Sequence, residues 1–282
     1  MATPPLKTAV VTGATSGIGR WIAMGLAAAG HRVIMVGRNR ERGEATQAWI
    51  AARVPGAQTQ LHITDLSSLA ETRALGAAIL RDMPTLDLLV NNAGALCPRR
   101  VVTAEGHETT VATNLLSPIL LTQTLLPALQ AAPRARVVMI GSSSSDRAEI
   151  DPENLELTHG WSMVRAYAQS KLALMIESFA LAERLRHTTV TVNVVHPGLV
   201  ATRIVRHGGV AGLAWRLMAP FSLSEERGAA PPLFACLSPE LDGRTGIYIK
   251  RRGQARPNHR ALDPELVARV DKETALLLSR SI

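Results

Sequence analysis

The stretch TAVVTGATSGIG, residues 8–19, decides the fold of this 282-residue chain. Its β-branched start predicts a strand over residues 8–11, and the glycines after it predict a tight turn into a helix that Gly30 closes. Glycines in such a turn let the backbone approach a pyrophosphate, whose charge the free N–H groups of the helix N-terminus stabilise. The spacing G-x-x-x-G-x-G differs from the common fingerprint G-x-G-x-x-G and indicates a particular subgroup. A tight turn that binds nothing is the alternative.

The rest of the chain repeats this strand-and-helix rhythm. Apolar runs predict further strands at residues 32–36, 60–63, 86–90, 136–140, 190–195 and 246–250, with helical patterns between them. We expect one α/β domain, a doubly wound parallel (Rossmann) sheet of about seven strands with helices on both faces. Residues 1–250 form the expected nucleotide-binding domain, in which residues 203–228 are a flap over the substrate. Residues 251–282 are expected to form a basic turn and a C-terminal helix that packs on the same domain.

Composition limits the function classes. Hydrophobic residues make up 46% of the chain, enough for a buried core, and the formal net charge is +8. The arginines are spread along the chain except in the basic segment 250–260, for which a solvated loop is favoured over a nucleic-acid contact because no aromatic residues interleave the charges. Cys97 and Cys236 lie far apart, so we expect no disulfide, no metal site and a cytoplasmic location. Polar residues and prolines interrupt the apolar stretch 115–129, so no membrane span is expected.

The second predicted strand ends where dinucleotide folds bind the adenosine ribose. An acidic residue there would accept hydrogen bonds from a 2′-hydroxyl, whereas this chain has Arg38 and Arg40 around Asn39. A guanidinium prefers a 2′-phosphate, so NADP(H) is favoured over NAD(H), unless the arginines only coat the next helix. After the third strand, Asp65 either caps a helix or reaches the adenine.

Two side chains on one predicted helix suggest proton transfer. Tyr167 and Lys171 are four residues apart, so they share a helix face, and the ammonium is expected to lower the pKa of the phenol. Such pairs also occur on ordinary amphipathic helices. Hydroxyls follow the fifth strand at Ser142 and Ser143, and Asn114 lies in a largely apolar helix, where a packed amide is the simpler interpretation.

Taken together, these motifs resemble those of the short-chain dehydrogenase/reductase family over residues 6–250. The resemblance covers the cofactor turn from Thr12 to Gly19, the segment 91–94 (NNAG), Asn114, the set Ser142, Tyr167 and Lys171, and the segment 196–198 (HPG). Within the family, residues 37–39 (GRN), the 25-position gap from Ser142 to Tyr167 and the segment 256–258 (RPN) are similar to retinol-dehydrogenase-like members.

The resemblance implies hydride transfer between NADP(H) and the carbonyl or carbinol carbon of an apolar or aromatic ketone, aldehyde or alcohol. Tyr167 would exchange the proton, Lys171 would lower its pKa and hold the nicotinamide ribose, Ser142 would bind the substrate oxygen, and Asn114 would hold a water linked to Lys171. Ser143 remains a rival to Ser142. The implied cofactor-binding residues are Gly13, Thr15, Ser16, Gly17, Ile18, Gly19, Arg38, Asn39, Asp65, Leu66, Asn92, Ala93, Gly94, Tyr167, Lys171, Pro197, Gly198, Val200 and Thr202.

Other properties stay open at this level. Family members commonly pair through the helices that hold Asn114 and Tyr167, so a homo-oligomer is possible. A non-catalytic cofactor-sensing or scaffold protein on the same fold is the alternative function.

Overall fold

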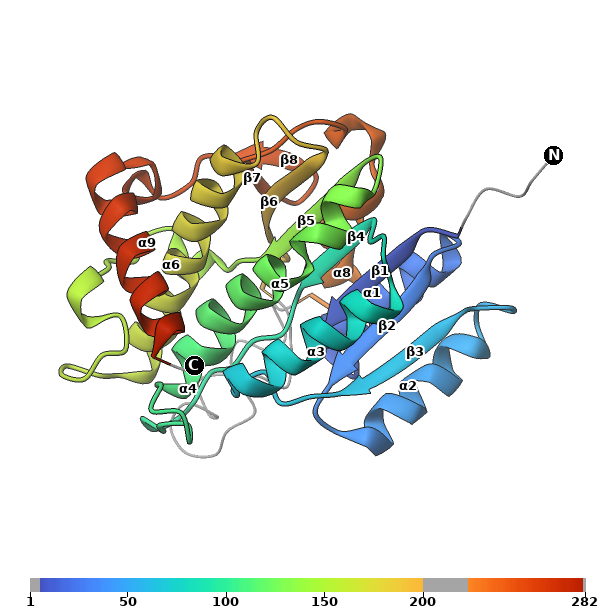
Figure 1. Cartoon of the computed structure of the whole chain (residues 1–282), viewed down its shortest axis with the longest axis horizontal. Helices are drawn as coiled ribbons and strands as arrows, with labels where there is room; N and C mark the ends of the chain where they lie inside the picture. Colours follow the sequence, from blue (N-terminus) through green and yellow to red (C-terminus); the bar gives the residue numbers. More distant parts are fainter. Residues whose placement is uncertain (1–5, 200–222, 281–282) are drawn as a thin grey trace.

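Eight strands form a single sheet at the centre of the molecule (Figure 1). The structure is a computed structural model that describes residues 6–199 and 223–280. The sheet order is β3-β2-β1-β4-β5-β6-β7-β8, and all neighbours are parallel except β7 and β8, which are antiparallel. The strands are β1 (Thr8–Thr12), β2 (Arg32–Gly37), β3 (Thr59–Ile63), β4 (Leu88–Asn91), β5 (Ala135–Ile140), β6 (Val190–His196), β7 (Tyr248–Lys250) and β8 (Gly253–Ala255).

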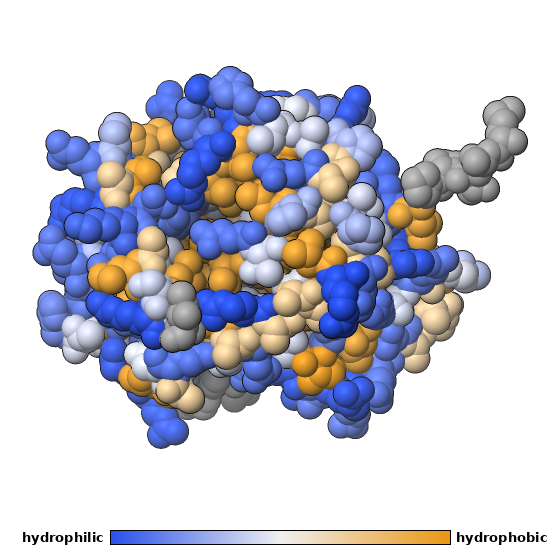
Figure 2. All heavy atoms as spheres, in the orientation of Figure 1, coloured by the Kyte–Doolittle hydropathy of each residue, from blue (hydrophilic) through white to orange (hydrophobic). Residues whose placement is uncertain are grey.

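Helices cover both faces of the sheet, and each face has its own apolar core. One core joins the sheet to α3 (Leu69–Asp82), α5 (Ser117–Ala131), α6 (Met163–Arg184) and α9 (Pro264–Ser279). The other joins it to α1 (Gly17–Ala28), α2 (Arg40–Ala51) and α8 (Glu225–Leu237). On the side drawn in Figure 2, the rim of the molecule is mainly hydrophilic, and many hydrophobic residues show nearer the centre. Short helices complete the chain at α4 (Thr109–Val111), η2 (Ser143–Ser145), η3 (Pro152–Asn154), η6 (Pro239–Leu241) and η7 (His259–Leu262).

The predicted fold class is confirmed, with two differences. The sheet has eight strands rather than about seven, because part of the predicted basic turn forms the edge strand β8, which pairs with β7 through Lys250 and Gly253. A turn residue makes this hairpin possible: Arg251 adopts a left-handed backbone conformation at φ 57°. Residues 203–222 of the predicted flap lie outside the described residues, while Glu225 to Gly228 begin α8 instead.

The apolar helix before β5 contains a π-helical segment that the sequence pattern does not reveal. Residues Ala112–Leu116 (η1) form π-helix between α4 and α5, so Thr109–Ala131 is one continuous helix. By length and composition this helix could cross a membrane, but most of it is buried in the apolar core that the sheet shares with α3, α6 and α9. A π segment widens the turn locally and shifts the side chains after it, and such segments occur often at functional sites.

Candidate active site

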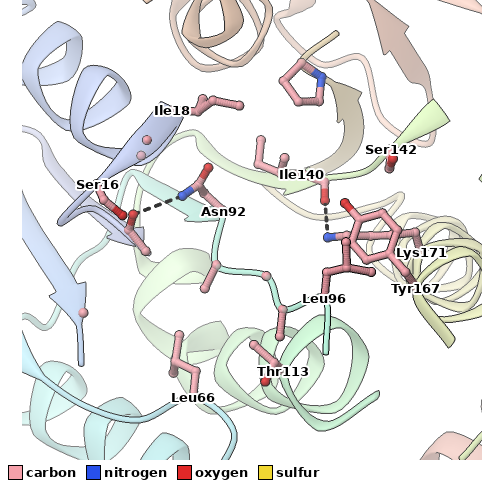
Figure 3. Close-up of a pocket in the computed structure, with 18 of the residues that line it drawn as sticks. Ser16, Ile18, Leu66, Asn92, Leu96, Thr113, Ile140, Ser142, Tyr167 and Lys171 are labelled. Atoms are coloured by element: carbon pink, nitrogen blue, oxygen red, sulfur yellow. Dashed lines mark hydrogen bonds between the residues drawn. The ribbon is translucent and has the colours of Figure 1, made fainter. Parts of the chain in front are cut away.

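A pocket of about 520 Å³ opens at the carboxyl ends of the central strands. It runs from the turn after β1, past the ends of β2, β3 and β4, to the ends of β5 and β6 and the inner face of α6 (Figure 3). The strand order reverses between β1 and β4, and ligands of open α/β sheets bind in the crevice at such a reversal. The pocket therefore lies where the topology places a nucleotide.

The glycine turn forms a close-fitting wall at one end of the pocket. Gly13 has φ 64°, and a Cβ there would lie 3.0 Å from the Cα of Ala93 and from Nδ2 of Asn92. Asn92 fastens the turn, because its Nδ2 donates to the carbonyl of Thr12 at 2.8 Å and its backbone N–H donates to Thr12 Oγ1 at 2.9 Å. Thr15, Gly17, Ile18, Gly19 and Gly94 also line this part of the pocket.

The helix that follows this turn is open to an anion. Ser16 is the N-cap of α1, but its side chain makes no capping hydrogen bond and the first turn holds no acidic residue. By contrast, side chains cap the N-termini of α2, α3, α6, α8 and α9. The uncapped N–H groups of α1 carry partial positive charge, and the neighbouring Gly13 leaves no room for a Cβ, so the backbone itself faces the pocket. The positive charge and the close approach of the backbone both fit the pyrophosphate of a dinucleotide.

Two arginines line the pocket near the end of β2. Arg38, which is exposed, lies there as predicted, and Arg42 joins it from the first turn of α2. Asn39 lines the pocket too, but its side chain caps α2 by accepting a hydrogen bond from the Arg42 N–H at 2.8 Å. Arg40 is not among the lining residues and pairs with Glu44 at 3.7 Å on the exposed face of α2. Sequence reasoning missed Arg42, whose only signal was its place one turn after the strand end.

Asp65 and Leu66 form the wall after β3, together with Thr64 and Ser67. Asp65 does not cap the next helix, because Ser68 is the N-cap of α3. One Asp65 oxygen instead accepts two hydrogen bonds from Ser67, each at 2.9 Å. The capping alternative was therefore wrong, and Asp65 remains in the pocket wall.

Tyr167 and Lys171 meet at the other end of the pocket, as their spacing predicts (Figure 3). Lys171 is buried, and its Nζ donates to the carbonyl of Ile140 at 2.8 Å. Burial lowers the pKa of Lys171 to about 8, because an ammonium loses its hydration. Burial also raises the pKa of Tyr167, while a hydrogen bond with Ser142 acts in the opposite direction. The structure differs from the expected lowering of the Tyr167 pKa by Lys171: burial raises that pKa and the Ser142 hydrogen bond is what opposes it, so Tyr167 stays a neutral phenol at pH 7.

The structure separates the roles of the two rival serines. Ser142 is the residue that hydrogen-bonds Tyr167, and its Oγ also accepts from the Ser144 N–H at 3.2 Å. Ser143 is exposed, and its N–H donates to Nδ1 of His196 at 3.1 Å. Both line the pocket, but the geometry pairs Ser142 with the phenol.

Asn114 lies behind the pocket rather than in its lining. Its Oδ1 accepts from the Ala95 N–H at 2.7 Å, and its Nδ2 donates to the Ala95 carbonyl at 2.9 Å and to Ser170 Oγ at 3.0 Å. The π-helical segment thus supports the chain after β4 and the helix that holds Tyr167. The predicted water held by Asn114 stays a prediction.

Some lining residues have no clear sequence signal, and some predicted ones lie outside the described structure. The pocket is also lined by Ala95, Leu96, Cys97, Pro98, Thr109, Thr113, Ile140, His196 and Leu199. Pro197 and Gly198 line it as predicted, whereas Val200 and Thr202 lie outside the described residues. Burial raises the pKa of the Cys97 thiol, which keeps it protonated at neutral pH. Within residues 6–199 and 223–280, no group of three or more His, Cys, Asp or Glu side chains could hold a metal ion.

Similar proteins indicate the family of this chain. Residues 7–209 match the family model described as short chain dehydrogenase. Mouse polyprenol dehydrogenase is 37% identical over 94% of this chain and 82% of its own length, and human retinol dehydrogenase 12 is 36% identical over 87% and 78%. A crystal structure of a Burkholderia cenocepacia short chain dehydrogenase in complex with NADP has a TM-score of 0.70 at 28% identity, covering 86% of this chain and 95% of that one. This chain belongs to the short-chain dehydrogenase/reductase family of oxidoreductases, in which it resembles the retinol-dehydrogenase-like members.

Proposed function

We propose that this protein transfers a hydride between NADP(H) and the carbonyl or carbinol carbon of an apolar or aromatic ketone, aldehyde or alcohol. The observation that carries the proposal is the convergence of Tyr167, Lys171 and Ser142 at one end of a pocket whose other end is the uncapped N-terminus of α1. A proton donor and an anion site at opposite ends of one cavity suit a dinucleotide with its reactive ring beside the phenol.

Each residue at the reacting end has a separate task. The nicotinamide cofactor, when bound, supplies or takes the hydride. Tyr167 donates a proton to the oxygen of the carbonyl, and its raised pKa keeps that proton on the phenol at neutral pH until the carbonyl oxygen takes it. Ser142 hydrogen-bonds the same oxygen and stabilises the negative charge that develops on it. Lys171, held at the Ile140 carbonyl, places a positive charge beside the phenol and favours proton release as the reaction proceeds.

The preference for NADP(H) is proposed from Arg38 and Arg42. Both line the pocket near the end of β2, and a guanidinium binds a phosphate more strongly than a ribose hydroxyl. The NADP in the related Burkholderia structure supports this choice. We expect Arg38→Ala and Arg42→Ala each to weaken NADPH binding on the order of tenfold, as for one charge-assisted hydrogen bond, with little effect on NADH. Arg40→Ala, in the first turn of α2 but outside the pocket, is the matched control, and equal losses for the two cofactors would remove the preference.

The apolar character of the substrate is proposed from the pocket wall and from the relatives. Leu96, Ile140 and Leu199 contribute hydrophobic surface around the reacting end. Two relatives are named for dehydrogenation of polyprenol and retinol, both of which are apolar alcohols. We place the protein in a reducing compartment such as the cytoplasm, because Cys97 and Cys236 are both free thiols.

One assay tests the activity directly. The protein is mixed with NADPH and a panel of aryl ketones, aldehydes and long-chain enals, and the loss of cofactor absorbance is followed. Tyr167→Phe should abolish turnover while NADPH binding, measured by fluorescence, survives. Cofactor binding without turnover of any carbonyl, or of any alcohol with NADP⁺, would favour the scaffold function instead.

A further inference from the structure

We infer that His196 is a positioning residue, which orients the serine turn by accepting a hydrogen bond from Ser143 and releases that turn when the imidazole is protonated. The inference rests on the proposed function, because it concerns the placement of Ser142. It begins from one contact, the donation of the Ser143 N–H to Nδ1 of His196 at 3.1 Å.

The contact takes the place of a missing ladder bond between β5 and β6. The Gly141 N–H donates to the carbonyl of Val195 at 2.9 Å, as in a regular parallel ladder. Since such bonds are evenly spaced, the next acceptor for the Ser143 N–H would be the carbonyl of residue 197. The Ser143 N–H instead bonds the His196 side chain, at the point where Pro197 follows the last residue of β6. His196 thus extends the pairing of the two strands by one bond, and that bond falls next to Ser142.

The other side of the serine turn is fixed to the C-terminal part of the chain. Asp146, directly after η2, accepts hydrogen bonds from Tyr248 at 3.0 Å and from Lys250 at 2.5 Å, both on β7. Asn258 donates to the carbonyl of Ser145 at 2.9 Å. With one end of the turn held by β7 and Asn258, the bond from Ser143 to His196 decides how the other end, which carries Ser142, faces Tyr167.

Only a neutral imidazole can accept this bond. A protonated His196 would present an N–H to the N–H of Ser143, so the bond would be lost. The charged groups that act on His196 are Lys250 from β7 and Asp146 from the segment after η2, while Tyr167 and Lys171 from α6 share its pocket. Burial lowers the pKa of His196, Lys250 lowers it further and Asp146 opposes them, so the acceptor form prevails at neutral pH and is lost in acid.

Three substitutions distinguish positioning from bulk packing. His196→Asn keeps an acceptor close to the position of Nδ1 that does not titrate near neutrality, His196→Gln carries the same amide one bond further out, and His196→Leu has no acceptor. With NADPH and a carbonyl that the wild type reduces, we expect the wild-type kcat to fall in acid. His196→Asn should stay within about threefold of the wild-type kcat at pH 7.5 and lose the acid decline, whereas His196→Gln and His196→Leu should lose on the order of tenfold, as for one misplaced hydrogen bond.

Equal losses in all three variants, or a wild-type kcat and pH profile in His196→Leu, would overturn the inference. A second measurement does not need activity: the amide NMR signal of Ser143 should titrate with the same midpoint as the His196 ring, and it should not titrate in His196→Asn. A Ser143 signal that stays constant while His196 titrates would also overturn it. A wild type that reduces no carbonyl would count against the proposed function, while the NMR titration would still decide the role of His196.

Discussion

Replacing Glu177 by glutamine should stabilise the protein at pH 8 and change its stability little at pH 5. Glu177 lies on α6, is 1% exposed, and its Oε1 has no hydrogen-bond partner among the described residues. Burial raises its pKa from 4.5 to about 7, and the nearby carboxylate of Asp271 on α9 adds to the increase, while Thr274 and Arg184 oppose it. Ionisation of the Glu177 carboxyl group, which is buried between α6 and α9, therefore lowers the free energy of unfolding.

The size and sign of the effect follow from proton linkage. Between pH 4.5 and about 7 the native state keeps a proton that the unfolded state has released, so the free energy of unfolding falls as pH rises through this window. At 1.36 kcal/mol per pH unit, the full cost at pH 8 is about 3 kcal/mol, while at pH 5 it is below about 1 kcal/mol. Glutamine has nearly the same shape and carries no charge, so the Glu177→Gln variant should avoid this cost.

Urea unfolding followed by circular dichroism at pH 5, 6.5 and 8 measures the difference in the free energy of unfolding between the wild type and Glu177→Gln. Glu183→Gln is the matched control, because Glu183 lies on the same helix but is exposed and pairs with Arg186 in solvent, where such pairs contribute at most about 1 kcal/mol. A Glu177→Gln variant that is less stable than the wild type at pH 8, or whose advantage does not change with pH, would refute the reasoning.

Three further predictions concern the site. Lys171 loses its charge as pH rises through about 8, so the kcat of carbonyl reduction should fall across that range, and Lys171→Arg, which keeps its charge, should remove this decline when kcat is measured from pH 6 to 10. Asn114→Ala leaves both backbone groups of Ala95 without their partner, so urea unfolding should show a loss of about 2–4 kcal/mol together with a lower kcat; unchanged stability would contradict the bonds described. In Gly19→Ala the new Cβ would clash with the carbonyl of Gly13, so NADPH binding, measured by fluorescence, should be lost. In Gly253→Ala the new Cβ has no atom within 4 Å, so this variant should bind NADPH as the wild type does.

Local sequence patterns were enough to predict the seven parallel strands, the fold class and the glycine turn, but not strand β8, the start of α8 or the π-helical segment. The runs that became β1 and β6 are continuous and β-branched, which in a βαβ rhythm means strands buried on both faces. The glycines after β1 predicted a turn, and the positive φ of Gly13 and Gly17 shows why glycine is favoured at those positions. Tyr167 and Lys171 share a helix face because of their four-residue spacing. All of these are local properties, which the order of residues specifies directly.

The contacts of those side chains depend on the folded arrangement of distant segments. Asn114 bonds a backbone 19 residues away, Ser143 bonds a histidine 53 residues away, and Arg42 reaches the pocket only because α2 begins at its edge. The direction of the Tyr167 pKa shift also depended on the fold, since desolvation by surrounding atoms raises it and exceeds the lowering by the Ser142 hydrogen bond. Hydrogen-bond partners and burial depend on which distant segments come together, and periodicity along a chain carries no information about that.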